Sequence, residues 1–230
     1  MGIGPAHIGL IGGIGPAATE FYYRGLVDRH ARAGTVLDLT IAHADLREMA
    51  QNLTDRAAQK QAESFARLIR RLAASGAELA AITSLGGHFC IRELEAISPL
   101  PLLNAIPAVD AAIRLRKLAT VGIIGTRTVM ETGLYGGITS ARIVRPEGAA
   151  LDEVHDAYIT MAMAGHVTDG QRRVFFAAGR QLCQAQGAEA IVLGGTDLFL
   201  AFAGQDCDFP VIDGADVHVD ALFRRSTGNR

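Results

Sequence analysis

The fold of this chain is decided by two stretches in which a run of apolar residues ends in a glycine turn. The first reads Leu79-Ala80-Ala81-Ile82-Thr83-Ser84-Leu85-Gly86-Gly87-His88, and the second reads Ala190-Ile191-Val192-Leu193-Gly194-Gly195-Thr196-Asp197. Continuous apolar runs of this length, bounded by glycine, are typical of strands covered on both faces in a parallel sheet. Ligands of such sheets bind outside the carboxyl ends of the strands. The two turns therefore predict a small-molecule site to which both halves of the chain contribute.

Outward from these stretches, strand patterns alternate with helix patterns along the whole chain. Strands are predicted at 8–12, 36–42, 79–84, 102–106, 119–125, 141–144, 191–194 and 210–212. Helices are predicted at 16–31, at 54–74 with Thr54 as N-cap, at 128–136, at 151–188 with a break near 165–170, and at 215–223. This alternation indicates right-handed βαβ crossovers and an α/β protein with parallel sheets flanked by helices.

The chain length of 230 residues allows one large domain or two lobes of about 100 residues. No Gly/Ser-rich linker separates the halves, and the stretch 100–109 joins them. We predict a first lobe formed by residues 1–105 with 213–230, to which the last helix returns. Residues 106–212 are predicted to form the second lobe.

Composition excludes several classes of partner. The chain is 49% hydrophobic and 20% charged, and its formal net charge is only −2. A chain without a basic surface is not expected to bind nucleic acid or an anionic membrane, and no apolar stretch approaches the roughly 20 residues that span a bilayer. Cys90, Cys183 and Cys207 form no CxxC pair, which indicates reduced thiols and a cytoplasmic protein. No cluster has metal-ligand spacing, so no metal is expected.

A glycine loop follows the first predicted strand and reads Gly12-Gly13-Ile14-Gly15-Pro16. It satisfies the permissive dinucleotide fingerprint, but Pro16 fits that fingerprint poorly and no acidic residue clearly ends the second strand to hold a ribose. We instead expect Gly13 and Gly15 to let backbone amides at a helix N-terminus approach a carboxylate. A tight turn without a ligand is the alternative.

These motifs carry a likeness to a known family. The matching segments are Ile8–Pro16 with the helix from Ala18 to Tyr22, Gly125-Thr126-Arg127, Asp152–His155, and Leu193-Gly194 with Thr196-Asp197. The chain resembles the aspartate/glutamate racemase family, and especially its broad-specificity aspartate/glutamate racemases, which work without pyridoxal phosphate. The resemblance implies two similar α/β lobes related by pseudo-two-fold symmetry, an active site in the cleft between them, no cofactor, and a homodimer.

The family inverts an α-carbon with two cysteines, one from each lobe. Its first pattern, Cys-Asn-Thr-x-His, places Ser84 at the cysteine position when it is counted back from His88. Its second pattern, Gly-Cys-Thr-Glu, places Gly195 at the other cysteine. Because a glycine has no side chain to move a proton, a two-thiol racemase is excluded. Cys90 is a candidate substitute, since a helix start can lower a thiol pKa.

The remaining polar residues form the predicted site. The candidate catalytic residues are Ser84, His88, Asp197 and Cys90, and the candidate substrate-binding residues are Gly13, Gly15, Arg47, Thr126, Gly195 and Thr196. His43 ends the second strand and is also expected to face the site. Each role has a structural alternative: His88 packs against its own helix, Asp197 and Thr126 act as N-caps, and Arg47 is a surface residue.

Three functions are compatible with this pattern, and all take a small carboxylate or amino acid as partner. In the first, which we adopt as the working hypothesis, an isomerase transfers a proton at carbon with His88, Asp197 or Cys90 in place of the thiols. In the second, a lyase or decarboxylase uses the same lobes. In the third, a catalytically silent protein binds carboxylates. The sequence identifies neither the substrate nor whether turnover occurs.

Overall fold

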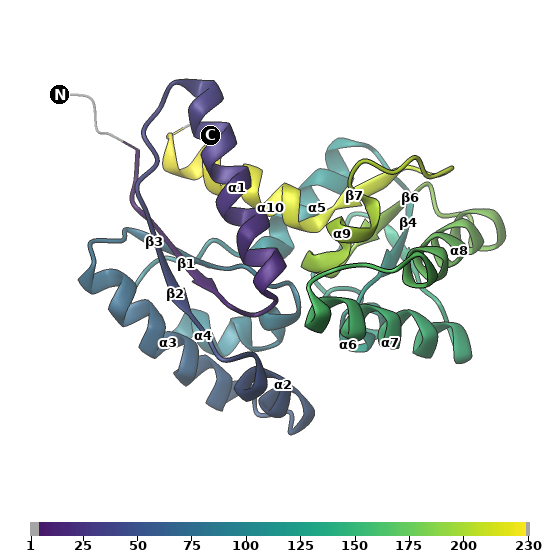
Figure 1. The fold of residues 1–230 in the computed structure, drawn as a ribbon, viewed down its shortest axis with the longest axis horizontal. Coiled ribbons are helices and arrows are strands. Elements are labelled where there is room, and N and C mark those ends of the chain that lie inside the picture. The colour runs from purple at the N-terminus through teal and green to yellow at the C-terminus, as the bar shows by residue number, and fades with distance from the viewer. Residues whose placement is uncertain (1–4, 229–230) are drawn as a thin grey trace. The chain divides into compact units, whose positions relative to one another are not determined.

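The computed structural model describes residues 5–228, and within them two separate parallel sheets are flanked by helices (Figure 1). Internal contacts divide the chain into two units, each with its own sheet. Unit 1 comprises the residues up to Asn104 together with those from His218, and unit 2 comprises Ala105–Val217. The predicted α/β class, with two parallel sheets flanked by helices, is confirmed.

The sheet of unit 1 has three strands in the order β2-β1-β3. Its strands are β1 (Ile8–Gly12), β2 (Leu39–His43) and β3 (Leu79–Ile82). Every residue of β1 and β3 is buried, because helices cover both faces of this sheet, as the continuous apolar runs indicated. The helices are α1 (Pro16–Ala33), α2 (Leu46–Thr54), α3 (Ala58–Ala74), the short 3-10 helix η1 (Gly86–Cys90), α4 (Ile91–Ile97) and the part of α10 (Gly214–Ser226) from His218 onward.

Two predictions for unit 1 are wrong. The predicted helix over 54–74 is two helices: Thr54 ends α2 and is not an N-cap, and α3 begins at Ala58. The break lies at Arg56, whose φ of 53° cannot continue a helix. The predicted strand 102–106 is reduced to one parallel bridge between Ala80 and Leu102. The chain then turns into α5 at Ala105, where Pro107 suits the first turn of a helix.

The sheet of unit 2 has four strands in the order β5-β4-β6-β7. Its strands are β4 (Thr120–Ile124), β5 (Arg142–Val144), β6 (Ala190–Leu193) and β7 (Val211–Asp213). Its helices are α5 (Ala105–Leu115), α6 (Arg127–Thr132), α7 (Ala149–Ala164), α8 (Asp169–Gln186), the 3-10 helix η2 (Thr196–Leu198) and α9 (Phe199–Phe202). Its core places Tyr158 of α7 and Phe175 and Leu182 of α8 against Ile191 and Leu193 of β6.

The two units have the same internal topology. In each sheet the first strand is central, the second pairs on one side of it and the third on the other. The bridge of Leu102 to Ala80 stands where β7 pairs with β6 in unit 2. The turns after β3 and β6, which were singled out from the sequence, are therefore equivalent positions in the two units.

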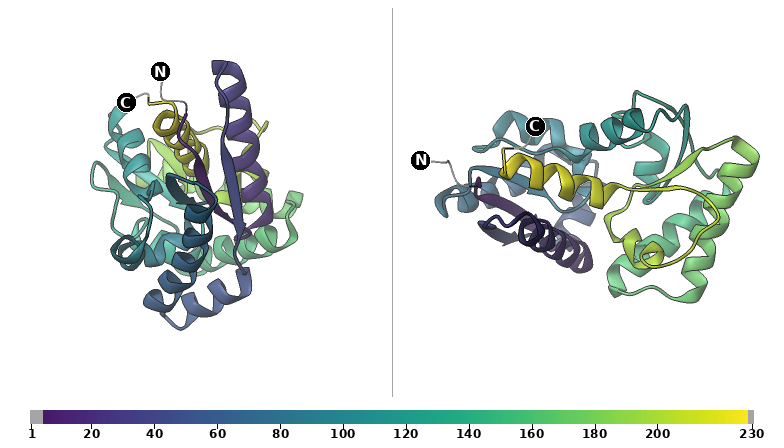
Figure 2. Two further views of the ribbon diagram at one scale, coloured as in Figure 1. Left: turned by 90° about the vertical axis from the view of Figure 1, so that its left-hand side faces the viewer. Right: turned by 90° about the horizontal axis from the view of Figure 1, so that it is seen from above.

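The last helix completes unit 1. From His218 onward, α10 lies beside α1 (Figure 2), where the Tyr22 hydroxyl bonds His218 Nδ1 at 2.8 Å. A Cβ at Gly25 would lie 2.9 Å from Val219 Cγ1, so glycine lets the two helices approach closely. Among residues 5–228, no helix is both long enough and apolar enough to cross a membrane.

Candidate functional site

The turn that follows β3 carries two hydroxyl residues in unit 1. Thr83 Oγ1 donates a hydrogen bond to the Ile11 carbonyl of the adjacent β1 at 3.1 Å. Ser84 Oγ accepts a hydrogen bond at 3.2 Å from the amide of Gly87, which lies in the first turn of η1. Both threonine and serine are buried. An unactivated serine hydroxyl is a poor base, so the predicted role of Ser84 is limited to hydrogen bonding.

The glycine loop after β1 is connected to this turn by hydrogen bonds. The Gly13 amide donates to Thr19 Oγ1 at 2.9 Å, and Thr19 Oγ1 lies 3.4 Å from Thr83 Oγ1. Gly13 and Gly15 have φ of 88° and 80°, and a Cβ at Gly13 would lie 2.5 Å from the exposed His43 ring. The Gly13 amide is therefore bonded within the protein, and it is not among the amides open to a carboxylate. The loop needs glycine for its backbone conformation and for its contact with His43.

His88 belongs to a buried network of aromatic groups. Its Nδ1 donates to the Ser84 carbonyl at 2.7 Å, because a carbonyl can only accept, and its ring centroid lies 5.9 Å from that of His218. His218 Nε2 donates to the Leu103 carbonyl at 2.9 Å, so His218 Nδ1 accepts from the Tyr22 hydroxyl at 2.8 Å. Burial lowers the pKa of His88 to about 4. The pKa of His218 is lowered to about 3, mainly by burial and further by the charge that His88 would carry. Both imidazoles are therefore neutral at neutral pH.

Cys90 does not have the environment of a reactive thiol. Its side chain is fully buried at the end of η1, and its Sγ donates to the Gly87 carbonyl at 3.6 Å. Burial, reinforced by the negative charge of Glu93, raises the pKa of Cys90 to about 12. We expected a helix start to lower this pKa, and that expectation is wrong because desolvation of the thiolate outweighs the terminus. The structure therefore opposes the predicted catalytic role of Cys90.

Arg47, which we expected in a loop after the second strand, lies in the first turn of α2. Asp45 is the N-cap of this helix, and its carboxylate accepts from the Arg47 amide at 2.7 Å. The arginine side chain is exposed, and no ion pair to a described residue holds it. A carboxylate role and a surface role both remain compatible with this position.

The turn after β6 carries the corresponding residues of unit 2. Gly125, at the end of β4, lies against this turn, since a Cβ there would come within 3.0 Å of Gly194. Thr196 and Asp197 follow in η2, and both side chains are buried. Thr196 Oγ1 is enclosed, and the Thr196 side chain also interacts with the hydroxyl of the buried Tyr158.

Asp197 is contacted by a tyrosine that the sequence did not single out. Tyr158 of α7 is buried, and its hydroxyl donates to Asp197 Oδ2 at 3.2 Å. Burial, and then the charge of Asp197, raises the pKa of Tyr158 well above its usual range. The phenol is consequently a hydrogen-bond donor that stays protonated at neutral pH. The sequence alternative for Asp197, a simple N-cap, does not describe this contact.

Thr126 acts as the N-cap of α6, which was its predicted structural alternative. Its hydroxyl accepts from the Val129 amide at 3.4 Å, and its side chain is buried. The next amide, that of Arg127, donates to His155 Nδ1 at 3.1 Å, so His155 is neutral. Arg127 also pairs with Asp152. These bonds tie the start of α6 to α7 and place Thr126 near the carboxyl end of β4.

Comparison with known proteins identifies the family. The model of the Asp/Glu/hydantoin racemase family matches residues 11–222. The chain belongs to this family.

A candidate Asp/Glu racemase from Yersinia pestis shares 25% identity at a TM-score of 0.83, with 96% of this chain and 99% of that chain covered. An aspartate racemase homologue from Pyrococcus horikoshii shares 22% identity at a TM-score of 0.77, covering 96% and 98%. Glutamate racemase from Francisella tularensis, in complex with D-glutamate, shares 16% identity at a TM-score of 0.69, covering 95% and 80%.

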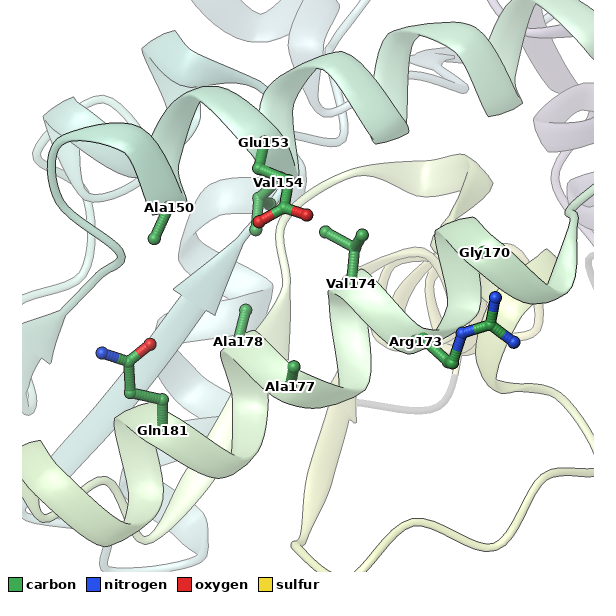
Figure 3. A pocket seen from close by; sticks show the side chains of 9 residues that line it. All are labelled: Ala150, Glu153, Val154, Gly170, Arg173, Val174, Ala177, Ala178 and Gln181. Atoms are coloured by element: carbon green, nitrogen blue, oxygen red, sulfur yellow. The ribbon is translucent and has the colours of Figure 1, made fainter.

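A surface hollow of this racemase-family chain lies away from the predicted site residues. It has a volume of about 410 Å³ and lies between α7 and α8 of unit 2 (Figure 3). Glu153 and Val154 of α7 face Val174 and Ala178 of α8 across it, with Arg173 at one end. None of the predicted site residues lines this hollow, so it is not part of the candidate site.

The structure thus groups the predicted residues within each unit. Ser84, His88 and the glycine loop lie together in unit 1, and Thr126, Gly195, Thr196 and Asp197 lie together in unit 2. Sequence reasoning missed Tyr22, Tyr158 and His218. Their partners are distant in sequence, and nothing local marks them: Tyr158 follows Val154 and precedes Met161 at the spacing of an ordinary buried helix face.

Proposed function

We propose that this racemase-family chain binds a small amino acid or dicarboxylic acid and transfers a proton at carbon, without a cofactor and without a thiol pair. One observation supports this most directly. At equivalent positions of the two sheets, after β3 and after β6, a buried turn combines a hydroxyl with a titratable side chain. Parallel sheets bind ligands at these carboxyl ends. Following the family resemblance, we propose that these two turns carry the groups that act on the substrate.

In this proposal, His88 is the acid/base group of unit 1. Its tautomer is fixed by the Ser84 carbonyl, which leaves the ring lone pair on Nε2. Burial lowers its pKa to about 4, so the ring is unprotonated at neutral pH, and its uptake of a proton depends on substrate contacts that stabilise the imidazolium. Ser84 supports this ring through its carbonyl and offers a hydroxyl to the substrate.

Asp197 is the corresponding group of unit 2. Its carboxylate is buried in the turn after β6 and is bonded by the Tyr158 hydroxyl. The buried hydroxyl of Thr196 in the same turn is a proposed contact of the substrate carboxylate. Thr126, Arg47, Gly15 and the backbone of Gly195 remain proposed substrate contacts.

A lyase or decarboxylase is the second candidate, and one observation favours it. The side chain nearest to position 195, where the family has its second cysteine, is the Tyr158 phenol. This phenol stays protonated at neutral pH because burial raises its pKa. A decarboxylation needs a proton delivered to one face only, whereas racemisation needs an exchange at both faces. The absence of a thiol at either family position is compatible with one-sided chemistry.

The test is to incubate the full-length chain with single enantiomers of aspartate and glutamate and with unbranched and substituted dicarboxylic acids. Chiral chromatography detects inversion, and carbon dioxide and ammonia are assayed in the same samples. We expect inversion of at least one amino acid; release of carbon dioxide or ammonia without inversion favours the second candidate. Neither product, combined with a rise in melting temperature on adding the acid, would leave a carboxylate-binding protein and overturn the proposal.

Two further proposals concern the oligomeric state and the cellular location. We propose that the protein acts as a homodimer, as family members often do, and that it is cytoplasmic, because its three cysteines include no CxxC pair. Sedimentation of the purified chain tests the first of these, and a predominantly monomeric species would contradict it.

A further inference from the structure

The backbone conformation at position 195 does not require a glycine. Its φ of −119° and ψ of 128° are extended, a conformation that any residue adopts. A Cβ at this position would lie 2.2 Å from Cε2 and 2.5 Å from Cζ of Tyr158. Atoms cannot approach so closely, and both atoms belong to a buried ring, which cannot swing into solvent. The tyrosine therefore excludes every side chain from position 195.

The same tyrosine holds the acidic residue of the turn. Its hydroxyl lies 2.9 Å from where the Cβ of residue 195 would stand and donates to Asp197 Oδ2 at 3.2 Å. This contact restrains the carboxylate on its Oδ2 side. Tyr158 comes from α7, packed in the core against β6, so its ring is not free to adopt another position.

We infer that Tyr158 is the positioning residue of the unit 2 turn. Its ring fills the space of a side chain at 195, and its hydroxyl orients Asp197 toward the substrate. In this arrangement a carboxylate, and not a group at position 195, is the polar side chain through which unit 2 acts on a substrate. The inference rests on the proposed function only where it assigns Asp197 a role toward substrate.

Two consequences follow that need no substrate for their test. A thiol cannot be restored at position 195 by one substitution, because the Tyr158 ring stands in its place. Restoring it requires a second substitution that removes the ring. In addition, loss of the phenol hydroxyl removes a hydrogen bond to the ionised Asp197, which makes the carboxylate easier to protonate.

The steric test is a double-mutant cycle on the full-length chain. Gly195→Cys is compared with Tyr158→Ala, with the double variant, and with the control Gly170→Cys, whose Cβ would meet nothing closer than 3.8 Å. We expect Gly195→Cys to lower the melting temperature much more than Gly170→Cys, and Tyr158→Ala to relieve part of that loss. The thiol at 195 should react with iodoacetamide in the folded double variant. Equal, additive effects of Gly195→Cys in both backgrounds would overturn the inference.

The positioning test uses Tyr158→Phe, which keeps the ring and removes the hydroxyl, with the half-exposed Tyr23→Phe as control. The Asp197 carboxyl carbon is followed by NMR as pH is lowered. We expect its titration midpoint to rise by roughly one pH unit in Tyr158→Phe, the size of one hydrogen bond to a charged group, and to stay unchanged in Tyr23→Phe. An unchanged midpoint in Tyr158→Phe overturns the positioning role. Failure of all candidate substrates would instead contradict the proposed function and leave both readouts intact.

Discussion

His88 is held in a single tautomer by its bond to the Ser84 carbonyl, and its burial keeps the ring neutral. These two properties distinguish it from the other acid/base candidate of the same turn. Cys90 is equally buried, but burial of a thiol has the opposite consequence, because it removes the reactive thiolate. The chemistry proposed for unit 1 therefore depends on a neutral base and not on sulfur.

Replacing His88 by glutamine should reduce turnover by at least about 100-fold, since a positioned acid/base group contributes about 10²–10⁴-fold. The measurement is the initial rate of inversion or product release, with melting temperature followed in parallel to show that the variant is folded. His166→Gln, at an exposed histidine after α7, is the matched control and should retain the wild-type rate. A folded His88→Gln variant with an undiminished rate would contradict the proposed role.

Cys90→Ala should leave turnover unchanged, because a thiol with its pKa raised to about 12 supplies no thiolate at neutral pH. It should also lower the melting temperature, since the substitution opens a small cavity in a closely packed region. In the folded wild type, iodoacetamide should modify the partly buried Cys183 and Cys207 well before Cys90. Rapid modification of Cys90 that abolishes turnover would restore its catalytic role.

Among the secondary-structure elements, the strands were predicted best. The buried apolar runs of β1, β3, β4 and β6 carry their own signal, because every residue of a doubly covered strand is apolar or small. The helices α2 and α5 were missed. Asp45 caps α2 through its side chain, which is a local helix-start signal that a single aspartate does not make specific. The helix α5 begins soon after Leu102, whose single bridge to Ala80 extends the sheet pattern up to its start.

The candidate site was predicted only in part, for a related reason. Ser84, His88, Thr196 and Asp197 stand in glycine turns directly after buried strands, so their position follows from the sequence pattern. Tyr158 reaches Asp197 from a helix 39 residues earlier in the chain, and His218 reaches His88 from the last helix. Contacts over such separations are fixed by packing and leave no trace in local spacing.

The N-cap of α6 offers a test at the level of a single helix. Thr126→Ala should destabilise the protein by about 1 kcal/mol, the usual contribution of an N-cap, and should also weaken carboxylate binding if Thr126 contacts the substrate. Thr168→Ala, which removes the capping box of α8, is the control for stability alone. The measurements are urea unfolding and ligand-induced change in melting temperature. Equal ligand affinity in the two variants would assign Thr126 a purely structural role.

At the level of the whole chain, the buried histidines of unit 1 predict how stability depends on pH. His88 and His218 have folded pKa values of about 4 and about 3, below the 6.5 of the unfolded chain. The unfolded chain therefore binds more protons, and stability falls as pH drops below 6.5, by about 1.4 kcal/mol per pH unit for each histidine. Asp213 of unit 2, whose pKa burial raises to about 6, opposes this trend because its folded form holds the proton more tightly.

Comparison of variants isolates this effect. Between pH 6 and pH 4.5, His218→Gln should show a shallower loss of unfolding free energy than the wild type, by about 1.4 kcal/mol per pH unit. Urea unfolding at several pH values measures it, with His166→Gln as the control. Parallel curves for the wild type and His218→Gln would show that His218 does not resist protonation in the folded state.

Proton transfer at carbon by residues other than cysteine can be followed by proton NMR in deuterium oxide. The α-proton signal of aspartate or glutamate is followed in the presence of the wild-type chain, His88→Gln and Asp197→Asn. We expect the signal to disappear with the wild type and to persist with either variant. A signal that persists with the wild type, while the same amino acid raises its melting temperature, would rule out proton transfer at this carbon.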